Sequence, residues 1–201
     1  MNFSSQDKKR IRDYYRGCLN CHGINQAEAL SWSNQNAQQI RFQVLAQVGD
    51  LRGKSILDVG SGLGDLYPFL EKTVGEFNYL GVDLVPDLVV ASRVKYPQAR
   101  FENQDILDFN EGKFDYVLSS GAMSFKVTQH LEKYFAMIEK MFSLARLGLA
   151  FNMLDRRGHV DNELYAAYNG QEIEAFCRTL TPKVKLISGY SPQDFTLFLY
   201  P

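Results

Sequence analysis

A run of glycines after a strand-like segment is the strongest chemical signal in this 201-residue sequence. Residues 55–59 (SILDV) are a short apolar run of the kind that forms a buried parallel strand. The spacing D-x-G-x-G-x-G follows, with Asp58, Gly60, Gly62 and Gly64. Glycines let a ligand lie against bare backbone, and the helix expected next presents free N–H groups. The pattern predicts a ligand-binding turn, with a tight connection that binds nothing as the alternative.

The residue after the last glycine argues against a dinucleotide site. Such a site prefers G-x-G-x-x-G, so that the following helix can hold a pyrophosphate at its amino terminus. Here Asp65 places a negative charge at that position. The turn therefore favours a ligand other than NAD.

Two further aspartates follow the next strand-like segments. Asp83 lies 25 positions after Asp58, close to the ~20-residue spacing at which an acid meets ribose hydroxyls in this architecture. Asp105 follows a third short strand, and we expect its carboxylate to accept a hydrogen bond from an adenine amino group. Because the carboxyl ends of parallel strands line one crevice, the three acids predict a single nucleoside site.

Strand-like and helix-like patterns alternate from residue 55 onward, as in a parallel sheet covered on both faces. A helix is expected to start near residue 131 and to be capped by Gly148. We expect an α/β fold with a Rossmann-like, seven-stranded, mostly parallel sheet, an antiparallel last strand and a helical N-terminal cap. One domain, 1–201, would comprise the cap (1–50) and the α/β core (51–201). The expected strands are 55–59, 79–82, 99–102, 114–118, 149–154, 183–187 and 195–200.

Residues 55–154 resemble the class I S-adenosylmethionine-dependent methyltransferases, with four motifs in the family's order. DVGSGLG resembles the first motif, GVDL the second, NQDI the third and FDYVLSSG the fourth. The resemblance implies S-adenosylmethionine as cofactor and S-adenosylhomocysteine as product, with ribose on Asp83 and adenine beside Leu84, Asp105 and Ile106. The implied cofactor residues of the core are Asp58, Gly60, Ser61, Gly62, Gly64, Asp83, Leu84, Asp105, Ile106, Ser119 and Ser120.

The fourth motif departs from several branches of that family. Enzymes that methylate nucleobase amino groups usually carry Asn or Asp, then Pro-Pro and an aromatic residue, and SSGAMSF has none of these. Paired glutamates and a metal-binding acid cluster are missing there too, so we expect no metal. The resemblance therefore points to a small-molecule substrate, mainly by exclusion.

Methyl transfer from a sulfonium needs little acid–base machinery. The reaction is an in-line displacement, and holding the nucleophile near the methyl group while excluding water supplies ~7–11 kcal/mol. If the acceptor must lose a proton, His130 is the best-placed general base, because it starts the helix after the fourth strand. The alternative is an exposed histidine in the first turn of a helix. His159 has weaker support.

The helical segment before the first strand is expected to act as a lid. Arg41 would pair with the cofactor's carboxylate, and Trp32 would face its sulfonium through the indole ring. The alternative is that these side chains simply pack beside the apolar stripe of a helix. The candidate substrate-binding residues are Tyr14, Tyr15 and His22 in this segment, and Tyr165 and Tyr168 in the later polar loop.

Cys18, Cys21 and His22 spell C-x-x-C-H, the pattern of c-type haem attachment. Haem attachment requires export, and the amino terminus does not resemble a signal peptide. Zinc binding with Cys177 lacks a second C-x-x-C or H-x-x-x-H pair. We therefore expect ordinary reduced thiols in a cytoplasmic protein.

Composition excludes several classes of protein. The chain carries 22 Lys+Arg and 23 Asp+Glu, a formal net charge of −1, which counts against binding to nucleic acid through phosphate neutralisation. No stretch approaches the ~18 uninterrupted apolar residues of a membrane span. These features leave the oligomeric state open.

Methyl transfer to an oxygen, nitrogen or sulfur atom of a small metabolite is the favoured function. A cyclase, lyase or aminocarboxypropyl transferase would use the same cofactor differently, and a cofactor-binding module would perform no chemistry. Neither the acceptor nor the methylated atom follows from the sequence, because such specificity lies in loops.

Overall fold

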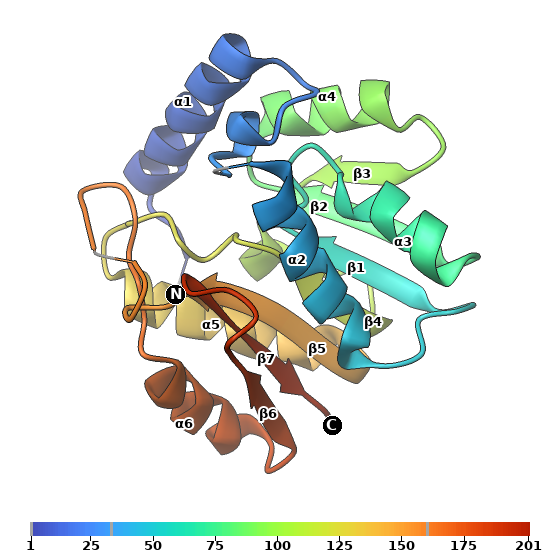
Figure 1. Cartoon of the computed structure of the whole chain (residues 1–201). Coiled ribbons are helices and arrows are strands. Elements are labelled where there is room, and N and C mark those ends of the chain that lie inside the picture. The colour runs from blue at the N-terminus through green and yellow to red at the C-terminus, as the bar shows by residue number, and fades with distance from the viewer. Residues whose placement is uncertain (1, 33, 160) are drawn as a thin grey trace.

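The computed structural model of the chain describes residues 2–32, 34–159 and 161–201. Figure 1 shows helices before the first strand and an alternation of strands and helices after it. None of the helices in the described ranges is both long and apolar enough to cross a membrane. The helical elements are α1 (Ser5–His22), η1 (Ala27–Leu30), α2 (Gln35–Leu45), η2 (Ala46–Val48), α3 (Leu66–Val74), α4 (Pro86–Lys95), η3 (Ile106–Asp108), α5 (His130–Leu144) and α6 (Gly170–Leu180). The strands are β1 (Ser55–Val59), β2 (Asn78–Asp83), β3 (Arg100–Asn103), β4 (Phe114–Ser119), β5 (Ala145–Leu154), β6 (Val184–Ile187) and β7 (Asp194–Leu199).

The strands form one seven-stranded sheet in the order β3-β2-β1-β4-β5-β7-β6. The first five of these strands pair in parallel, and β7 runs antiparallel between β5 and β6. This arrangement confirms the expected Rossmann-like fold. From β1 the chain runs outward through β2 and β3 and then crosses back to β4 on the other side of β1, and a ligand crevice opens at such a reversal of strand order.

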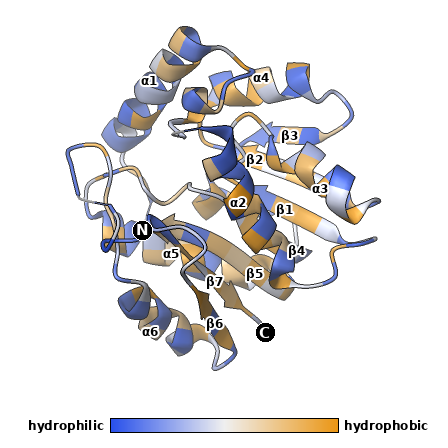
Figure 2. Ribbon diagram, viewed as in Figure 1, coloured by the Kyte–Doolittle hydropathy of each residue, from blue (hydrophilic) through white to orange (hydrophobic). Residues whose placement is uncertain are grey.

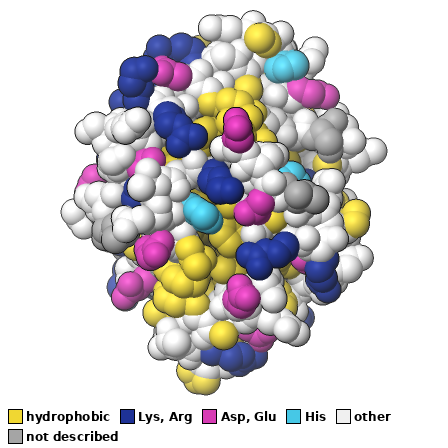
Figure 3. Space-filling model, turned by 90° about the vertical axis from the view of Figure 1, so that its left-hand side faces the viewer, with side chains coloured by type: hydrophobic (Ala, Val, Ile, Leu, Met, Phe, Trp, Pro, Cys, Tyr) yellow, Lys and Arg dark blue, Asp and Glu magenta, His cyan; other side chains and the backbone are white. Residues whose placement is uncertain are grey.

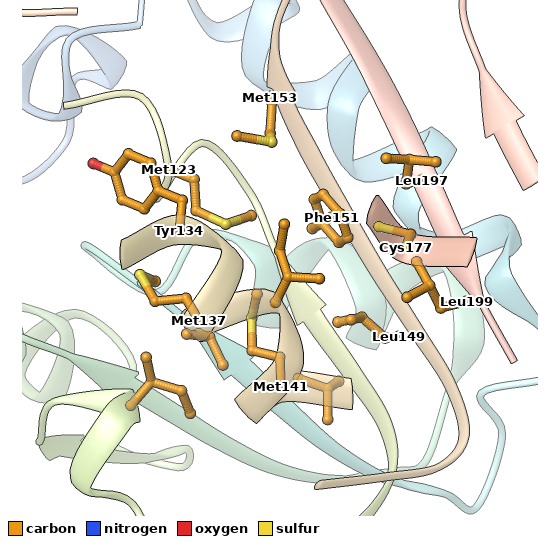
Figure 4. Close-up of a cluster of buried hydrophobic side chains, with 14 of the residues drawn as sticks. Met123, Tyr134, Met137, Met141, Leu149, Phe151, Met153, Cys177, Leu197 and Leu199 are labelled. Atoms are coloured by element: carbon orange, nitrogen blue, oxygen red, sulfur yellow. The ribbon is translucent and has the colours of Figure 1, made fainter. Parts of the chain in front are cut away.

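Both faces of the sheet are buried, which explains why the central strands are largely hydrophobic in Figure 2. On one face, Leu149 and Phe151 of β5 belong to an apolar cluster with Met137 of α5 and Cys177 of α6 (Figure 4). Alternate strand residues face the other way, toward α2 and α3, and form a second apolar cluster. That cluster includes Phe42, Leu45, Ile56, Leu66, Leu70, Leu118, Ala150 and Phe198.

The expectation that Gly148 caps the long helix is wrong. α5 ends at Leu144, and the chain enters β5 at once, so Gly148 lies inside that strand. A Cβ at Gly148 would lie 3.1 Å from Val48 and 3.3 Å from the ring of Tyr116. The glycine therefore allows β4 and η2 to approach β5 closely. The sequence alone does not distinguish a glycine that allows close packing from one that caps a helix.

Charged contacts attach α1 to the core at three places. Arg16 makes two hydrogen bonds to Asp87 at the start of α4, with N···O distances of 3.2 and 3.0 Å. The Nζ atom of Lys8 lies 2.7 Å from Oδ2 of Asp105. Asp7 forms an ion pair with Lys133 of α5. Because these contacts lie along the length of the helix, α1 covers the carboxyl ends of the strands rather than extending into solvent.

Asp7 and Lys133 form an ion pair that is withdrawn from solvent. Lys133 Nζ on α5 donates to Asp7 Oδ2 at 2.6 Å, and the two side chains are only 2% and 4% exposed. Asp7 also accepts hydrogen bonds from Ser4 and from the Thr128 amide. Burial raises the pKa of Asp7, but the hydrogen bonds from Lys133, Ser4 and Thr128 outweigh it and hold that pKa well below its usual range.

Replacing Asp7 with Asn is expected to lower the free energy of unfolding by about 3 kcal/mol, because it leaves the Lys133 ammonium buried without its counter-charge. Urea unfolding followed by circular dichroism measures this. The matched control is Lys9→Ala, which removes the exposed pair with Asp13 and should cost less than about 0.5 kcal/mol. Equal losses in the two variants would show that the buried pair does not hold α1 in place.

Candidate active site

The glycine turn after β1 has a backbone that only glycine adopts without strain. Gly60 and Gly62 have φ angles of 71° and 56°. A Cβ at Gly60 would lie 2.4 Å from the side chain of Ala122, and one at Gly62 would lie 2.8 Å from Leu30 of η1. The segment after β4 and the lid therefore press against the turn from two sides, which a larger residue would prevent.

Asp83 at the end of β2 connects the glycine turn to the next strand. Its Oδ2 accepts a hydrogen bond from the Gly62 amide and its Oδ1 accepts one from the Val85 amide, both at 2.8 Å. Burial raises the pKa of Asp83, and the two amide hydrogen bonds only partly offset the rise. A carboxylate offers about four acceptor sites, so those that the amides leave free are available to a ligand in the pocket that Asp83 lines.

Asp58 is buried at the end of β1, where it accepts a 2.6 Å hydrogen bond from the hydroxyl of Tyr79. Burial raises the pKa of Asp58 to about 7, with further contributions from the nearby carboxylates of Asp83 and Asp65 and an opposing effect of the Tyr79 hydrogen bond. The Asp58 carboxyl group therefore changes its ionisation near neutral pH.

A single pocket joins these aspartates to the lid. The core contributes the residues after β1 to β4, and the lid contributes side chains from α1, η1 and α2. The sequence-predicted residues that line this pocket are Tyr15, Trp32, Asp58, Gly60, Ser61, Gly62, Asp83, Leu84, Asp105, Ile106 and Ser120. Trp32 and Asp105, which are 73 positions apart in the chain, thus line the same cavity.

Gly64 and Ser119 are not among the lining residues. A Cβ at Gly64 would lie 2.5 Å from the ring of Phe101, so this glycine allows close packing of β3 rather than contact with a ligand. The hydroxyl of Ser119 is fully buried and donates to the carbonyl of Val59 at 2.9 Å. Ser119 therefore joins β4 to β1.

Arg41 has a different role from the one expected. Its Nε donates to Asp194 Oδ1 at 2.9 Å, its Nη2 lies 2.5 Å from Asp194 Oδ2, and both side chains are almost completely buried. Its guanidinium also lies over the Trp32 ring, 4.5 Å from the centroid. Arg41 does not line the pocket, so it supports Trp32 from behind and attaches α2 to β7.

His130 also lies outside the lining of the pocket, although it begins α5 as expected. Its ring packs edge-on against Tyr168, with 6.0 Å between centroids. Tyr168 is itself buried and does not line the pocket. The structure therefore places the expected general base and this substrate candidate away from the ligand crevice.

The remaining tyrosine candidates gather beside the pocket. The hydroxyl of Tyr14 lies 2.7 Å from that of Tyr165 and 2.9 Å from the Ser31 hydroxyl. Tyr15 lines the pocket next to them. His22 is exposed at the end of α1 and is not a lining residue. The N-terminal helical segment and the polar loop thus meet through the Tyr14–Tyr165 pair.

Sequence reasoning missed two polar residues of this region. Gln38 of α2 lines the pocket and donates to Asp65 at 3.3 Å. Asn152 of β5 is buried, and its Oδ1 accepts a 2.8 Å hydrogen bond from the Gly121 amide, which positions the segment after β4. The sequence signal for Asn152 is a polar residue inside an otherwise apolar strand, since buried polar groups need a partner.

The charge of Asp65, which argues against a pyrophosphate, is partly compensated in the structure. Lys95 Nζ lies 2.5 Å from Asp65 Oδ1, and the Tyr96 hydroxyl donates to the same atom at 2.9 Å. Both partners come from α4 and its end. Asp65 therefore links α4 to the helix that follows the glycine turn, as well as lining the pocket.

The cysteines show no arrangement for a metal. Cys18 is half-buried with its Sγ 3.8 Å from the Ser31 hydroxyl, Cys21 is exposed and Cys177 is buried in the core. Across 2–32, 34–159 and 161–201, no group of three or more His, Cys, Asp or Glu side chains is placed to hold a metal ion.

Three buried polar atoms of pocket-lining residues have no hydrogen-bond partner within the described part of the chain: the Ser61 hydroxyl, Trp32 Nε1 and Asp105 Oδ2. Asp105 Oδ2 is paired with the Lys8 ammonium at 2.7 Å, so Ser61 and Trp32 are left without a partner. Buried polar groups are nearly always satisfied in folded proteins, so unpartnered groups on a cavity wall indicate a polar ligand. With Asp83 one strand away, the residues fit a nucleoside joined to a polar tail.

A doubly wound sheet, a glycine turn at the reversal of strand order and an acid at the end of the second strand are the features of a nucleoside-binding domain. Residues 56–144 match a family model described as a methyltransferase domain. This match confirms the resemblance seen in the motifs: residues 56–144 match a methyltransferase domain, and the chain has the fold of the class I methyltransferases.

Relatives and solved structures agree with this assignment. The Mycobacterium tuberculosis protein named "Putative methyltransferase Rv1506c" is 26% identical over 157 residues, covering 72% of this chain and 92% of the relative. Magnesium protoporphyrin IX methyltransferase (ChlM) of Synechocystis PCC 6803 with bound S-adenosylhomocysteine has a TM-score of 0.73 at 20% identity, covering 96% of this chain and 98% of that one. The complex named DhpI-SAM-HEP has a TM-score of 0.72 at 14% identity and covers both chains fully.

Stability should depend on pH through Asp58. Its pKa is about 7 in the folded protein and ~3.9 in an unfolded chain, so the unfolded state loses the proton first. Stability therefore falls as the pH rises from ~4 to ~7 and then levels off. Between pH 5 and pH 8, the wild type should lose about 2 kcal/mol of unfolding free energy relative to Asp58→Asn.

Urea titrations at the two pH values measure this difference, and Asp115→Asn is the control. The pKa of Asp115 is lowered, chiefly by the Ser55 amide, so its contribution changes only below ~4. A wild type and an Asp58→Asn variant with parallel pH profiles would contradict a raised pKa at Asp58.

Proposed function

We propose that the protein transfers a methyl group from S-adenosylmethionine to an oxygen, nitrogen or sulfur atom of a small molecule. The observation that carries the proposal is the buried Asp83 carboxylate, which is fixed against the glycine turn and faces the pocket. In this proposal, residues 51–201 hold the cofactor and residues 1–50 form a lid over it within one domain.

Each part of the cofactor has a complementary group in the pocket. The free acceptor sites of Asp83 suit the two ribose hydroxyls. Leu84 and Ile106 offer apolar surface to adenine, beside the carboxylate of Asp105. The unpartnered Ser61 hydroxyl and Trp32 Nε1 are the donors available for a carboxylate, a role that Arg41 does not fill.

When bound, the cofactor supplies a sulfonium whose methyl group is open to in-line attack. The residues of this chain position the reactants and keep water out, through Leu30 on the glycine turn and Trp32 against Gly121. The rings of Tyr15, Trp32 and Phe125 line the pocket and can stabilise positive charge through their faces. His130 is not a lining residue, so the proposal uses no dedicated base.

Asp83→Asn is expected to weaken S-adenosylmethionine and S-adenosylhomocysteine binding by at least about tenfold, since an amide leaves a buried donor facing the Gly62 or Val85 amide. Isothermal titration calorimetry measures both affinities. The control is Asp13→Asn, an exposed substitution on α1 that should change neither. If the wild type binds neither compound, the proposal is wrong.

Product analysis separates methyl transfer from the other reactions. Incubation with S-adenosylmethionine and a panel of small acceptors should yield S-adenosylhomocysteine and a methylated acceptor. Methylthioadenosine as the product would instead show a cyclase, lyase or aminocarboxypropyl transferase. Tight cofactor binding without turnover on any acceptor would favour a binding module.

A further inference from the structure

The charged side chains that line the pocket are all acidic. They are Asp58, Asp65, Asp83 and Asp105, and each lies at or just after the carboxyl end of β1, β2 or β3. Within the described ranges, no Lys, Arg or His side chain belongs to the lining. All the charge of the pocket is therefore on the side of the glycine turn, where the proposed function places the cofactor.

The other side of the pocket is apolar and aromatic. Tyr15 of the lid packs against Phe125 of the segment after β4, and both line the cavity. Trp32 lies against Gly121, where a Cβ would be 2.5 Å from its ring. The residues at this end offer rings and methyl groups rather than ionised groups.

Several aromatic side chains hold this wall in place. The ring of Phe125 lies 6.3 Å from that of Tyr15 and 5.3 Å from that of Tyr14, between centroids. Behind it, the hydroxyls of Tyr14 and Tyr165 are paired. Burial raises the pKa of Tyr15 well above its usual range, so its phenol is neutral at physiological pH.

Nearby basic groups do not supply a counter-charge inside the cavity. Arg41 is paired with Asp194, and Lys8 with Asp105. Arg10 approaches the Phe125 ring, with Cζ 5.8 Å from the centroid, but its side chain is exposed and does not line the pocket. On the face with α1, Figure 3 shows hydrophobic side chains gathered in the middle, with charges of both signs scattered among them rather than a basic patch.

We propose that the methyl acceptor is an uncharged molecule with an aromatic or otherwise flat, apolar body, and that anionic acceptors are rejected. An anion that entered between Tyr15, Trp32 and Phe125 would lose its hydration and meet no Lys, Arg or His side chain of the described lining, which is costly. A flat apolar molecule instead buries surface against three rings. This inference rests on the proposed function, because it assigns the acidic side of the pocket to the cofactor.

Two dyes with one skeleton test the inference directly. N-Phenyl-1-naphthylamine is neutral, and 8-anilino-1-naphthalenesulfonate is the same molecule with a sulfonate. Trp32 is the only tryptophan and lines the pocket, so energy transfer from it to either dye reports binding near this site, and the Ile11→Lys variant below tests whether the dye lies in the pocket. With S-adenosylhomocysteine saturating, the neutral dye should bind at least about tenfold more tightly than the sulfonate.

Two lysine variants separate charge from general hydrophobicity. Ile11→Lys places an ammonium on the pocket wall at a half-buried position of α1, and it should reverse or abolish the preference by strengthening sulfonate binding. Val94→Lys adds the same charge on α4, at a side chain that is 70% exposed and outside the pocket. It should leave the ratio of the two affinities unchanged.

The outcomes distinguish this inference from the function beneath it. If calorimetry detects no S-adenosylhomocysteine binding, the proposed function fails and the acceptor inference fails with it. If S-adenosylhomocysteine binds but the sulfonate dye binds as tightly as the neutral one, only the acceptor inference is overturned. Failure of the neutral dye to bind, or a preference that Ile11→Lys leaves unchanged, also overturns it.

Discussion

The hydrogen bond from the Gly62 amide to the Asp83 carboxylate is the interaction on which the site depends. It fixes the turn after β1 against the end of β2, at the point where the order of the parallel strands reverses. Burial makes that carboxylate costly to ionise, so its negative charge is stabilised by fixed amides rather than by water. A ligand that offers hydroxyl groups then meets an acceptor that is already oriented.

The lid completes the site by packing and by charge. Leu30 lies on the glycine turn, and Trp32 lies on Gly121, held from behind by the guanidinium of Arg41. The ion pairs of α1 bring the helix over the strand ends, with Asp7 and Lys133 withdrawn from solvent. Of the three charged contacts of α1 described above, the pair of Arg16 and Asp87 is the most exposed and contributes least to this attachment.

Much of the core followed from the sequence because local patterns specify it. The apolar run before Gly60, the proline at the start of α4 and the acids after β2 and β3 predicted the fold and most of the cofactor side of the pocket. The side chains there are adjacent to their motifs, so spacing alone places them. The same reasoning misread Gly148, whose role depends on how closely β4 and η2 approach β5.

The lid and the acceptor side were harder to predict, because they depend on contacts between distant segments. Arg41 is paired with Asp194, 153 positions later in the chain, and no local pattern records that partner. His130 begins α5 as expected and shares a helix face with Tyr134 and Met137, but only Tyr134 and Met137 line the pocket, whereas the His130 ring packs against Tyr168. The partner of a charged residue such as Arg41 is thus determined by tertiary packing rather than by the local sequence.

The most direct test of the account is a crystal structure of the protein with S-adenosylhomocysteine. We expect the ribose hydroxyls on Asp83, the adenine between Leu84 and Ile106, and the sulfur atom facing the rings of Tyr15, Trp32 and Phe125. A complex with the ligand outside this pocket, or with its ribose remote from Asp83, would contradict the central claim that the glycine turn and Asp83 form the cofactor site.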